Sequence, residues 1–502
     1  NLNYNPKSRK TFTSTTDFSI PTNLASISSI PSVTTLPEPT WPETAIKKFK
    51  DENGQTPYNP AGGDYGTLLD LETVTGNTTN PYSGGSTETY TFNNPTSLSP
   101  GAYIFEKADS TNQVQIKFTA NSSPNIPSRT IIKAGKTEQS NPENADIIID
   151  VVLGSNTQMQ GKLMAERNIE ITGNIGSGNI GQTGQYYTLA AKKELTIRPN
   201  GNLTINGDIY AGNLLTINPN GNTIVINGNI NAKNNKISIT GTGTININGK
   251  IYAKSEIDIN GTNLNLTIDD EVNCESQIII RGTGTVTINE DIKAGLITSG
   301  GVNININGNV FSSNSDISIG GTGNVNIKGV VLGAKNITIS NPNLEIDVSN
   351  KNFPGAICRH GDGTININTS PQIKLDQHQH SAIFVDSGTG NININARLEP
   401  DYYKPTPQST TKQIAIINKA ISSSNININA EVIGAIYSTT NITLGTNGKV
   451  KGAIITDQTL NINGGEIIYD SKPFKNNTEV YSGFIGGRRK YLPVIGSWRI
   501  EW

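Results

Sequence analysis

The chain has 502 residues, of which 34% are hydrophobic and 51 are glycine, and its formal net charge is −2. This balance, with one run of three basic residues (Arg488-Arg489-Lys490), speaks against a nucleic-acid partner, which needs a basic surface. The chain as given shows no signal-peptide pattern and no stretch of about 20 apolar residues, so no membrane span is expected in it. Because it begins at Asn1 without Met, we expect a piece of a longer precursor whose export signal has been removed.

The first 60 residues are rich in Ser, Thr and Pro, as in "SIPSVTTLPEPTWPE". This composition predicts an extended strap without regular structure, docked on the body or mobile. Residues 61–146 are expected to form an irregular β region that leads into the first coils, with "TETYTFNN" and "QVQIKFTAN" as its clearest strands.

A repeat dominates the next part of the chain. The phrase Ile-Asn-Gly-x-Ile-x-Ala begins at residues 205, 226 and 247, and looser versions begin at 268, 288, 306 and 327. Apolar and polar residues alternate inside each repeat, which is the pattern of half-buried strands. A period near 20 with strand alternation predicts a solenoid. We therefore expect an all-β fold, a right-handed parallel β-helix of about 20–21 residues per coil over residues 147–470.

One coil can be divided into strands 203–206, 208–211 and 214–218, followed by the turn Pro219-Asn220-Gly221. The positions expected to point inward are Ile205, Ile209, Ala211, Leu215 and Ile217. Asn and Gly at the corners suit left-handed backbone, and stacked Asn side chains are expected to form amide ladders. Cys274 and Cys358 are too few for a disulfide framework and are expected to be buried.

Three stretches break the period, at 176–193, 358–381 and 398–413. Insertions in a solenoid form loops on its side, often the binding side. Residues 471–502 change composition sharply and are expected to cap the last coil.

Aromatic residues concentrate in these interruptions. Tyr186, Tyr187, Tyr402 and Tyr403 are expected on protruding loops, where a flat ring with a polar handle suits a sugar face or a partner protein. The alternative is that the rings fold back and shield the flank of the helix.

The coils themselves offer a second candidate surface. The outward position of the repeat reads Tyr210, Asn231, Tyr252, Asn273, Lys293, Phe311, Leu332. Tyr210 and Tyr252 would stand about 10 Å apart, close to one disaccharide repeat of an extended β-glucan. The alternative is that they cover the neighbouring coil or lie under the N-terminal strap, and the sequence favours it because Lys293 and Leu332 interrupt the pattern.

A polysaccharide-cleaving enzyme would need clustered carboxylates. Asp269-Asp270-Glu271 is the best cluster, but alternation sends Asp270 to the opposite face, and a solvated corner is the expected role. His378 and His380 alternate on one strand and, with His360, could chelate a metal. We expect exposed histidines instead, and no catalytic residues, metal or cofactor.

The Asn/Ile-rich coils, the proline-rich start, the tyrosine-bearing loops and the closing "GSWRIEW" resemble the C-terminal domain of tāpirins. These are cellulose-adhering surface proteins of extremely thermophilic, plant-degrading bacteria. The resemblance implies an extracellular location at the cell surface near type IV pili, binding of crystalline cellulose without hydrolysis, and contacts with cell-surface or pilus components.

The expected function is therefore that of a non-catalytic adhesin for cellulose or a related insoluble plant polysaccharide. Its carbohydrate-binding candidates are the tyrosines 186, 187, 402, 403, 210 and 252. A cleaving enzyme and a structural stalk or filament remain as alternatives.

Overall fold

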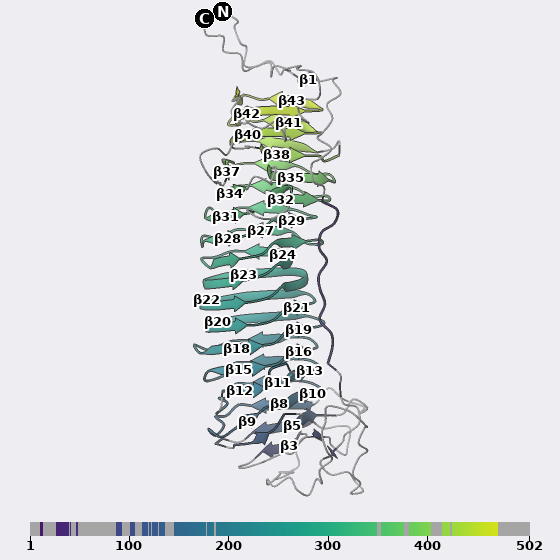
Figure 1. Cartoon of the computed structure of the whole chain (residues 1–502), viewed down its shortest axis with the longest axis vertical. Helices are drawn as coiled ribbons and strands as arrows, with labels where there is room; N and C mark the ends of the chain where they lie inside the picture. Colours follow the sequence, from purple (N-terminus) through teal and green to yellow (C-terminus); the bar gives the residue numbers. More distant parts are fainter. Residues whose placement is uncertain are drawn as a thin grey trace, which may run out of the picture. The chain divides into compact units, whose positions relative to one another are not determined.

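The fold is that of a computed structural model. It describes residues 11–13, 27–39, 41, 47–48, 87–92, 101–105, 113–118, 120–121, 123–128, 130–135, 145–176, 178–184, 187–348, 353–375, 381–402, 414–421 and 424–469. The described part of the chain is all-β, and its parallel strands stack into a β-solenoid of about 14 turns, as the sequence predicts (Figure 1). Among the described residues there is no helix that could cross a membrane.

The chain divides into two compact units. The N-terminal unit comprises Thr34–Glu275 with Gly282–Ile288, and the C-terminal unit comprises Asn1–Val33, Ser276–Arg281 and Asn289–Trp502. The long strand β23 (Val272–Ile288) contributes to both.

Three parallel ladders build the N-terminal unit. The first ladder is β3 (Thr87–Phe92), β5 (Gln113–Phe118), β8 (Ala145–Ile149), β11 (Ile169–Ile171), β14 (Leu195–Ile197), β17 (Leu215–Ile217), β20 (Lys236–Ile247) and β22 (Glu256–Ile268). The second is β6 (Asn125–Ile126), β9 (Gln158–Met159), β12 (Asn179–Gly181), β15 (Leu203–Asn206) and β18 (Thr223–Asn227), which continues into the second halves of β20 and β22. The third is β2 (Lys47–Lys48), β4 (Gly101–Phe105), β7 (Thr130–Ala134), β10 (Lys162–Ala165), β13 (Leu189–Ala191), β16 (Ile209–Ala211), β19 (Ile230–Ala232), β21 (Ile251–Ala253) and the start of β23.

The C-terminal unit repeats this plan. One ladder is β24 (Ile292–Thr298), β27 (Ile317–Ile319), β30 (Ile337–Ile339), β33 (Ile365–Ile367), β36 (Ile392–Ile394), β39 (Asn425–Ile428), β41 (Asn441–Leu444) and β43 (Thr459–Ile462). A second is β25 (Asn303–Ile306), β28 (Val325–Ile327), β31 (Leu344–Asp347), β34 (Gln372–Leu375) and β37 (Pro400–Tyr402), and a further run is β40 (Glu431–Ser438), β42 (Lys449–Thr456) and β44 (Glu466–Tyr469). The third starts from β24 and continues through β26 (Val310–Ser312), β29 (Val331–Gly333), β32 (Gly355–His360), β35 (Ser381–Ser387) and β38 (Ile414–Asn418) to β40, while β1 (Thr11–Thr13) pairs antiparallel with β43.

The core of each unit follows from the strand alternation. Ile205, Ile226 and Ile247 stand in register on successive coils and are fully buried. The inward positions predicted for one coil, Ile205, Ile209, Ala211, Leu215 and Ile217, are confirmed, because all five are buried. β-Branched side chains that repeat at the coil period therefore form continuous apolar stacks, which supply most of the hydrophobic stabilisation. Cys274 and Cys358 are both buried, as expected.

The corners and the polar rows also follow the prediction. Asn220 adopts a left-handed φ of 52° at the turn after β17. The Asn227 amide donates to Asn206 Oδ1 at 2.7 Å, and Asn248 donates to Asn227 Oδ1 at 2.7 Å. These three residues form the amide ladder of the N-terminal unit. Hydrogen bonding along the row satisfies polar groups that the stacking brings together.

The interruptions of the period are more regular than expected. Residues 176–193 contain β12 and β13, and residues 358–381 contain the end of β32 with β33 and β34, so both stretches build coils and are not side loops throughout. Parallel pairing also begins before residue 147, with β3 on β5 and β4 on β7. The expected cap, residues 471–502, lies outside the described residues.

Candidate functional site: a strap-covered groove and an amide-lined hollow

The outward row of the third ladder in the N-terminal unit is covered. Tyr210, Asn231, Tyr252 and Asn273 stand in register on four successive coils, and none is more than 4% exposed. Outward side chains become this deeply buried when another segment or neighbouring side chains lie over them. The outward direction agrees with the sequence prediction, whereas exposed coplanar rings are not formed.

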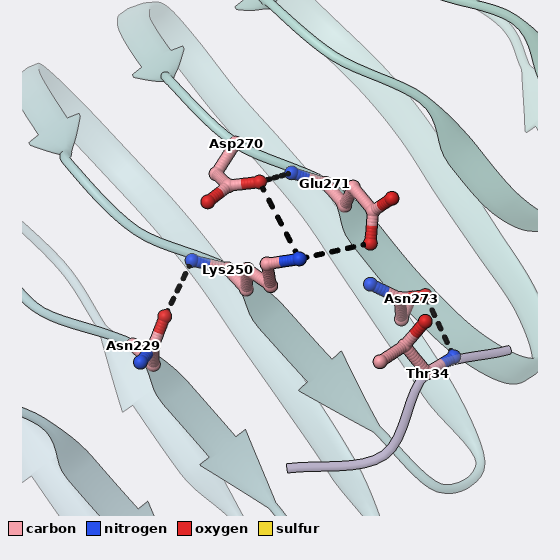
Figure 2. Close-up of polar contacts among 6 residues, drawn as sticks. All are labelled: Thr34, Asn229, Lys250, Asp270, Glu271 and Asn273. Carbon is pink, nitrogen blue, oxygen red and sulfur yellow. Dashed lines mark hydrogen bonds and ion pairs between the residues drawn. The ribbon is translucent and has the colours of Figure 1, made fainter.

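Residues 34–39 and Trp41 provide this cover, and we call the stretch 34–41 the strap segment. The Thr34 backbone N–H donates to Asn273 Oδ1 at 2.9 Å (Figure 2). The Asn231 amide donates to the carbonyls of Leu36 at 3.2 Å and Pro37 at 3.0 Å. The strap segment thus passes the coils in the reverse of their chain order, and its backbone groups are satisfied by the row of side chains beneath it. This is the alternative that the sequence favoured for Tyr210 and Tyr252.

Tyr187 belongs to the same covered surface. The sequence predicts an exposed loop position for this residue, but only 5% of it is exposed, and its hydroxyl donates to the Pro37 carbonyl. Its ring meets Tyr210 edge to face, with ring centroids 5.8 Å apart. The expected exposure of Tyr187 is therefore wrong, because an N-terminal segment lies over it. Burial, with a smaller contribution from Tyr187, raises the pKa of Tyr210 to about 12.

Trp41 closes one end of the groove. Its ring lies 6.2 Å from that of Tyr210 at an angle of 74° and packs on a buried cluster that includes Met164 and Ala190. Beneath it, Glu166 forms ion pairs with Lys133 at 2.7 Å and Lys192 at 2.6 Å. The Nζ atoms of these lysines lie 5.9 and 4.9 Å from the Trp41 ring centre, so cation–π attraction adds to the apolar contact.

Tyr186 and Tyr403 lie outside the described residues, and of Tyr402 only the backbone, in β37, is described. Their exposure and their binding role remain predictions.

The acidic run Asp269-Asp270-Glu271 lies at the corner between β22 and β23. Lys250 Nζ is 3.3 Å from Glu271 Oε2 and 3.9 Å from Asp270 Oδ1, and Figure 2 shows both carboxylates turned toward it. The expectation that Asp270 points to the opposite face is wrong, because strand alternation does not continue through a corner. Asp270 Oδ1 also accepts the Glu271 backbone N–H at 2.8 Å. Because Lys250 pairs with both carboxylates, the corner is a partly exposed ion-pair cluster. This arrangement differs from the two unpaired carboxylates that acid–base chemistry would use.

A second arrangement has the residue types of a hydrolase triad. His360 Nδ1 lies 3.2 Å from Asp386 Oδ2 and 3.4 Å from Ser387 Oγ. In a working triad the acid and the nucleophile contact opposite ring nitrogens, so that the imidazole can pass a proton. Here both contact Nδ1, which leaves Ser387 without that relay. His378 and His380 lie outside the described residues. Among those described, no three His, Cys, Asp or Glu side chains gather as a metal site.

A hollow of about 360 Å³ opens beside β9, β12 and β15 in the N-terminal unit. Its polar lining includes Gln158, Gln160, Asn179, Gln182, Thr183 and Asn206. None of the lining side chains is charged, and Met159 and Gly181 form part of its wall. The amides and the hydroxyl offer hydrogen-bond donors and acceptors but carry no net charge. Such a lining suits the hydroxyl groups of a neutral ligand.

The hollow is joined to the amide ladder through Asn206, which belongs to both. Each ladder amide uses one N–H or one oxygen lone pair toward each neighbour and keeps others for a ligand. Sequence reasoning did not identify the hollow, because its lining comes from three separate strands. The only signal was the pair of outward amides Gln158 and Gln160, which flank the buried Met159.

No protein-family model, no curated protein and no solved structure matches the chain.

Proposed function

We propose that the chain is a non-catalytic binding protein for an insoluble, uncharged plant polysaccharide, with cellulose as the first candidate, at an extracellular surface. The amide-lined hollow carries the proposal. Sugar hydroxyls are neutral donors and acceptors, and a lining of Gln, Asn and Thr without a charged group complements them.

The continuation into Asn227 and Asn248 extends this surface along the solenoid axis. Coils repeat at about 4.8 Å, which is near the length of one sugar unit in an extended β-glucan chain. A polymer aligned with the axis would thus meet one amide on each coil. Tyr186 follows the lining residue Thr183 by three positions in the chain and remains the aromatic candidate for this site.

The experiment is adsorption to microcrystalline cellulose. Gln158→Ala, Gln160→Ala and Gln182→Ala should each weaken adsorption several-fold and leave the melting temperature nearly unchanged, because exposed side chains contribute little to stability. Gln372→Ala, an exposed glutamine on β34, is the matched control and should adsorb as the unmodified chain does.

Salt and product analysis separate this function from the alternatives. Adsorption should depend only weakly on salt, because an uncharged polymer offers no counterion release. Soluble sugar released from cellulose would point to an enzyme, and equal adsorption by all four variants would remove the hollow from the site.

A further inference from the structure

The groove beneath the strap segment has the properties of a peptide-binding site. It is lined by aromatic rings (Tyr187 and Tyr210) and by amides that bind backbone carbonyls (Asn231). Aromatic grooves of this kind recognise extended proline-containing peptides, because such peptides lose little conformational entropy on binding. The strap segment, "TTLPEPTW", is a peptide of this type.

The contacts hold the segment through its backbone and through two of its side chains, Glu38 and Trp41. Pro37 presents its carbonyl to Tyr187 and Asn231, and the Glu38 carboxylate pairs with Lys233. Trp41 fills the end of the groove between Tyr210 and the Lys133–Glu166–Lys192 cluster. The Glu38 charge, the Trp41 ring and the Pro37 carbonyl are therefore each bound by different side chains of the coils.

We propose that this groove binds the same segment in trans, so that residues 34–41 of a second copy of this chain can occupy it. Each of these contacts joins an atom of the segment to a side chain of the coils. The fit is consequently the same whichever copy supplies the segment. Within one molecule, the groove binds its own segment preferentially only because that segment has a high effective concentration near the groove. When the concentration of the protein approaches this effective concentration, molecules can exchange their segments and become linked to one another.

The first test uses a labelled peptide of residues 31–43 and the full chain carrying Trp41→Ala. This substitution weakens the binding of the chain's own strap segment, so that the peptide can compete for the groove. Fluorescence anisotropy should show saturable binding, and a peptide with Trp41→Ala should bind about 30-fold more weakly, the usual loss for an aromatic anchor. A chain carrying both Trp41→Ala and Asn231→Ala should bind the unmodified peptide more weakly. If the Trp41→Ala chain does not fold, the less disruptive substitution Glu38→Ala can be used in the same titration. Absence of saturable binding by the unmodified peptide overturns the proposal.

The second test measures the mass of the unmodified chain by light scattering over a rising concentration series, after warming below its melting temperature. Dimers and larger species should appear, and an excess of the peptide should disperse them. A chain that stays monomeric at every concentration while the peptide binds would overturn a second copy as the partner. Both readouts are independent of cellulose, so they do not depend on the proposed function.

Discussion

The Tyr252 hydroxyl donates to Glu275 Oε1 at 2.7 Å, one coil away in the N-terminal unit. The hydrogen bond from Tyr252, followed by that from Lys254, lowers the pKa of Glu275. Burial and the same hydrogen bond raise the pKa of Tyr252. The hydrogen bond contributes to both shifts, because it needs a protonated phenol and an ionised carboxylate. For Tyr252, burial is the larger cause.

Tyr252→Phe should therefore raise the pKa of Glu275 toward its ordinary value. Since the folded pKa lies below the unfolded one, the contact contributes stability above the ordinary pKa of a glutamate, and this contribution is lost as pH falls through the folded value. NMR titration of the Glu275 carboxyl carbon, with and without the substitution, measures the shift. An unchanged Glu275 titration would assign the whole effect to Lys254.

Tyr210→Ala should destabilise the protein by about 3 kcal/mol, as expected for a buried aromatic ring. The ring contacts both Trp41 and Tyr187, so its loss opens a cavity under the strap segment. Thermal denaturation checks this, with Tyr210→Phe as the control that keeps the ring and should change stability much less. A melting temperature unaffected by Tyr210→Ala would mean that the strap segment does not stabilise the fold in solution.

Position within the amide ladder should set the cost of a substitution. Within the ladder, Asn227 donates one hydrogen bond and accepts another, whereas Asn248 only donates one. At about 1 kcal/mol for each bond, Asn227→Ala should cost roughly twice as much as Asn248→Ala in denaturant unfolding. Equal losses would show that water replaces the ladder bonds without cost.

Asp270→Asn and Glu271→Gln should leave adsorption to cellulose unchanged. Both carboxylates face Lys250 at a corner of the third ladder, apart from the lining of the hollow. Ion pairs with this exposure contribute about 0–1 kcal/mol, so stability should change little. Adsorption isotherms and reducing-sugar assays on the two variants test this expectation. Product release that one of these substitutions abolished would assign a catalytic role to the corner.

The coils could be predicted from the sequence because each one repeats the same local information. Ile205, Ile226 and Ile247 mark both the strand period and the coil period, and the asparagines beside them predict the ladder. Tyr187 could not be placed in this way. Its burial depends on Pro37, which is 150 residues away in the chain, and no periodicity connects the two. Neighbouring Gly and Gln residues made it resemble a loop residue, whereas a contact between distant segments decided its position.

The direction of the hydrogen bonds in the amide ladder has a consequence for recognition. Each Nδ2 donates toward the earlier coil, from Asn248 to Asn227 and from Asn227 to Asn206. The side-chain dipoles therefore point the same way. The N–H donors of the row face its N-terminal coil, and its oxygen acceptors face its C-terminal coil. A glucan chain is also vectorial, since its reducing and non-reducing ends differ. A glucan chain bound along the row in one direction would meet a different order of donors and acceptors from one bound in the other direction. If the proposed function holds, the row would therefore favour one of the two orientations of a polymer whose sugar units are all identical.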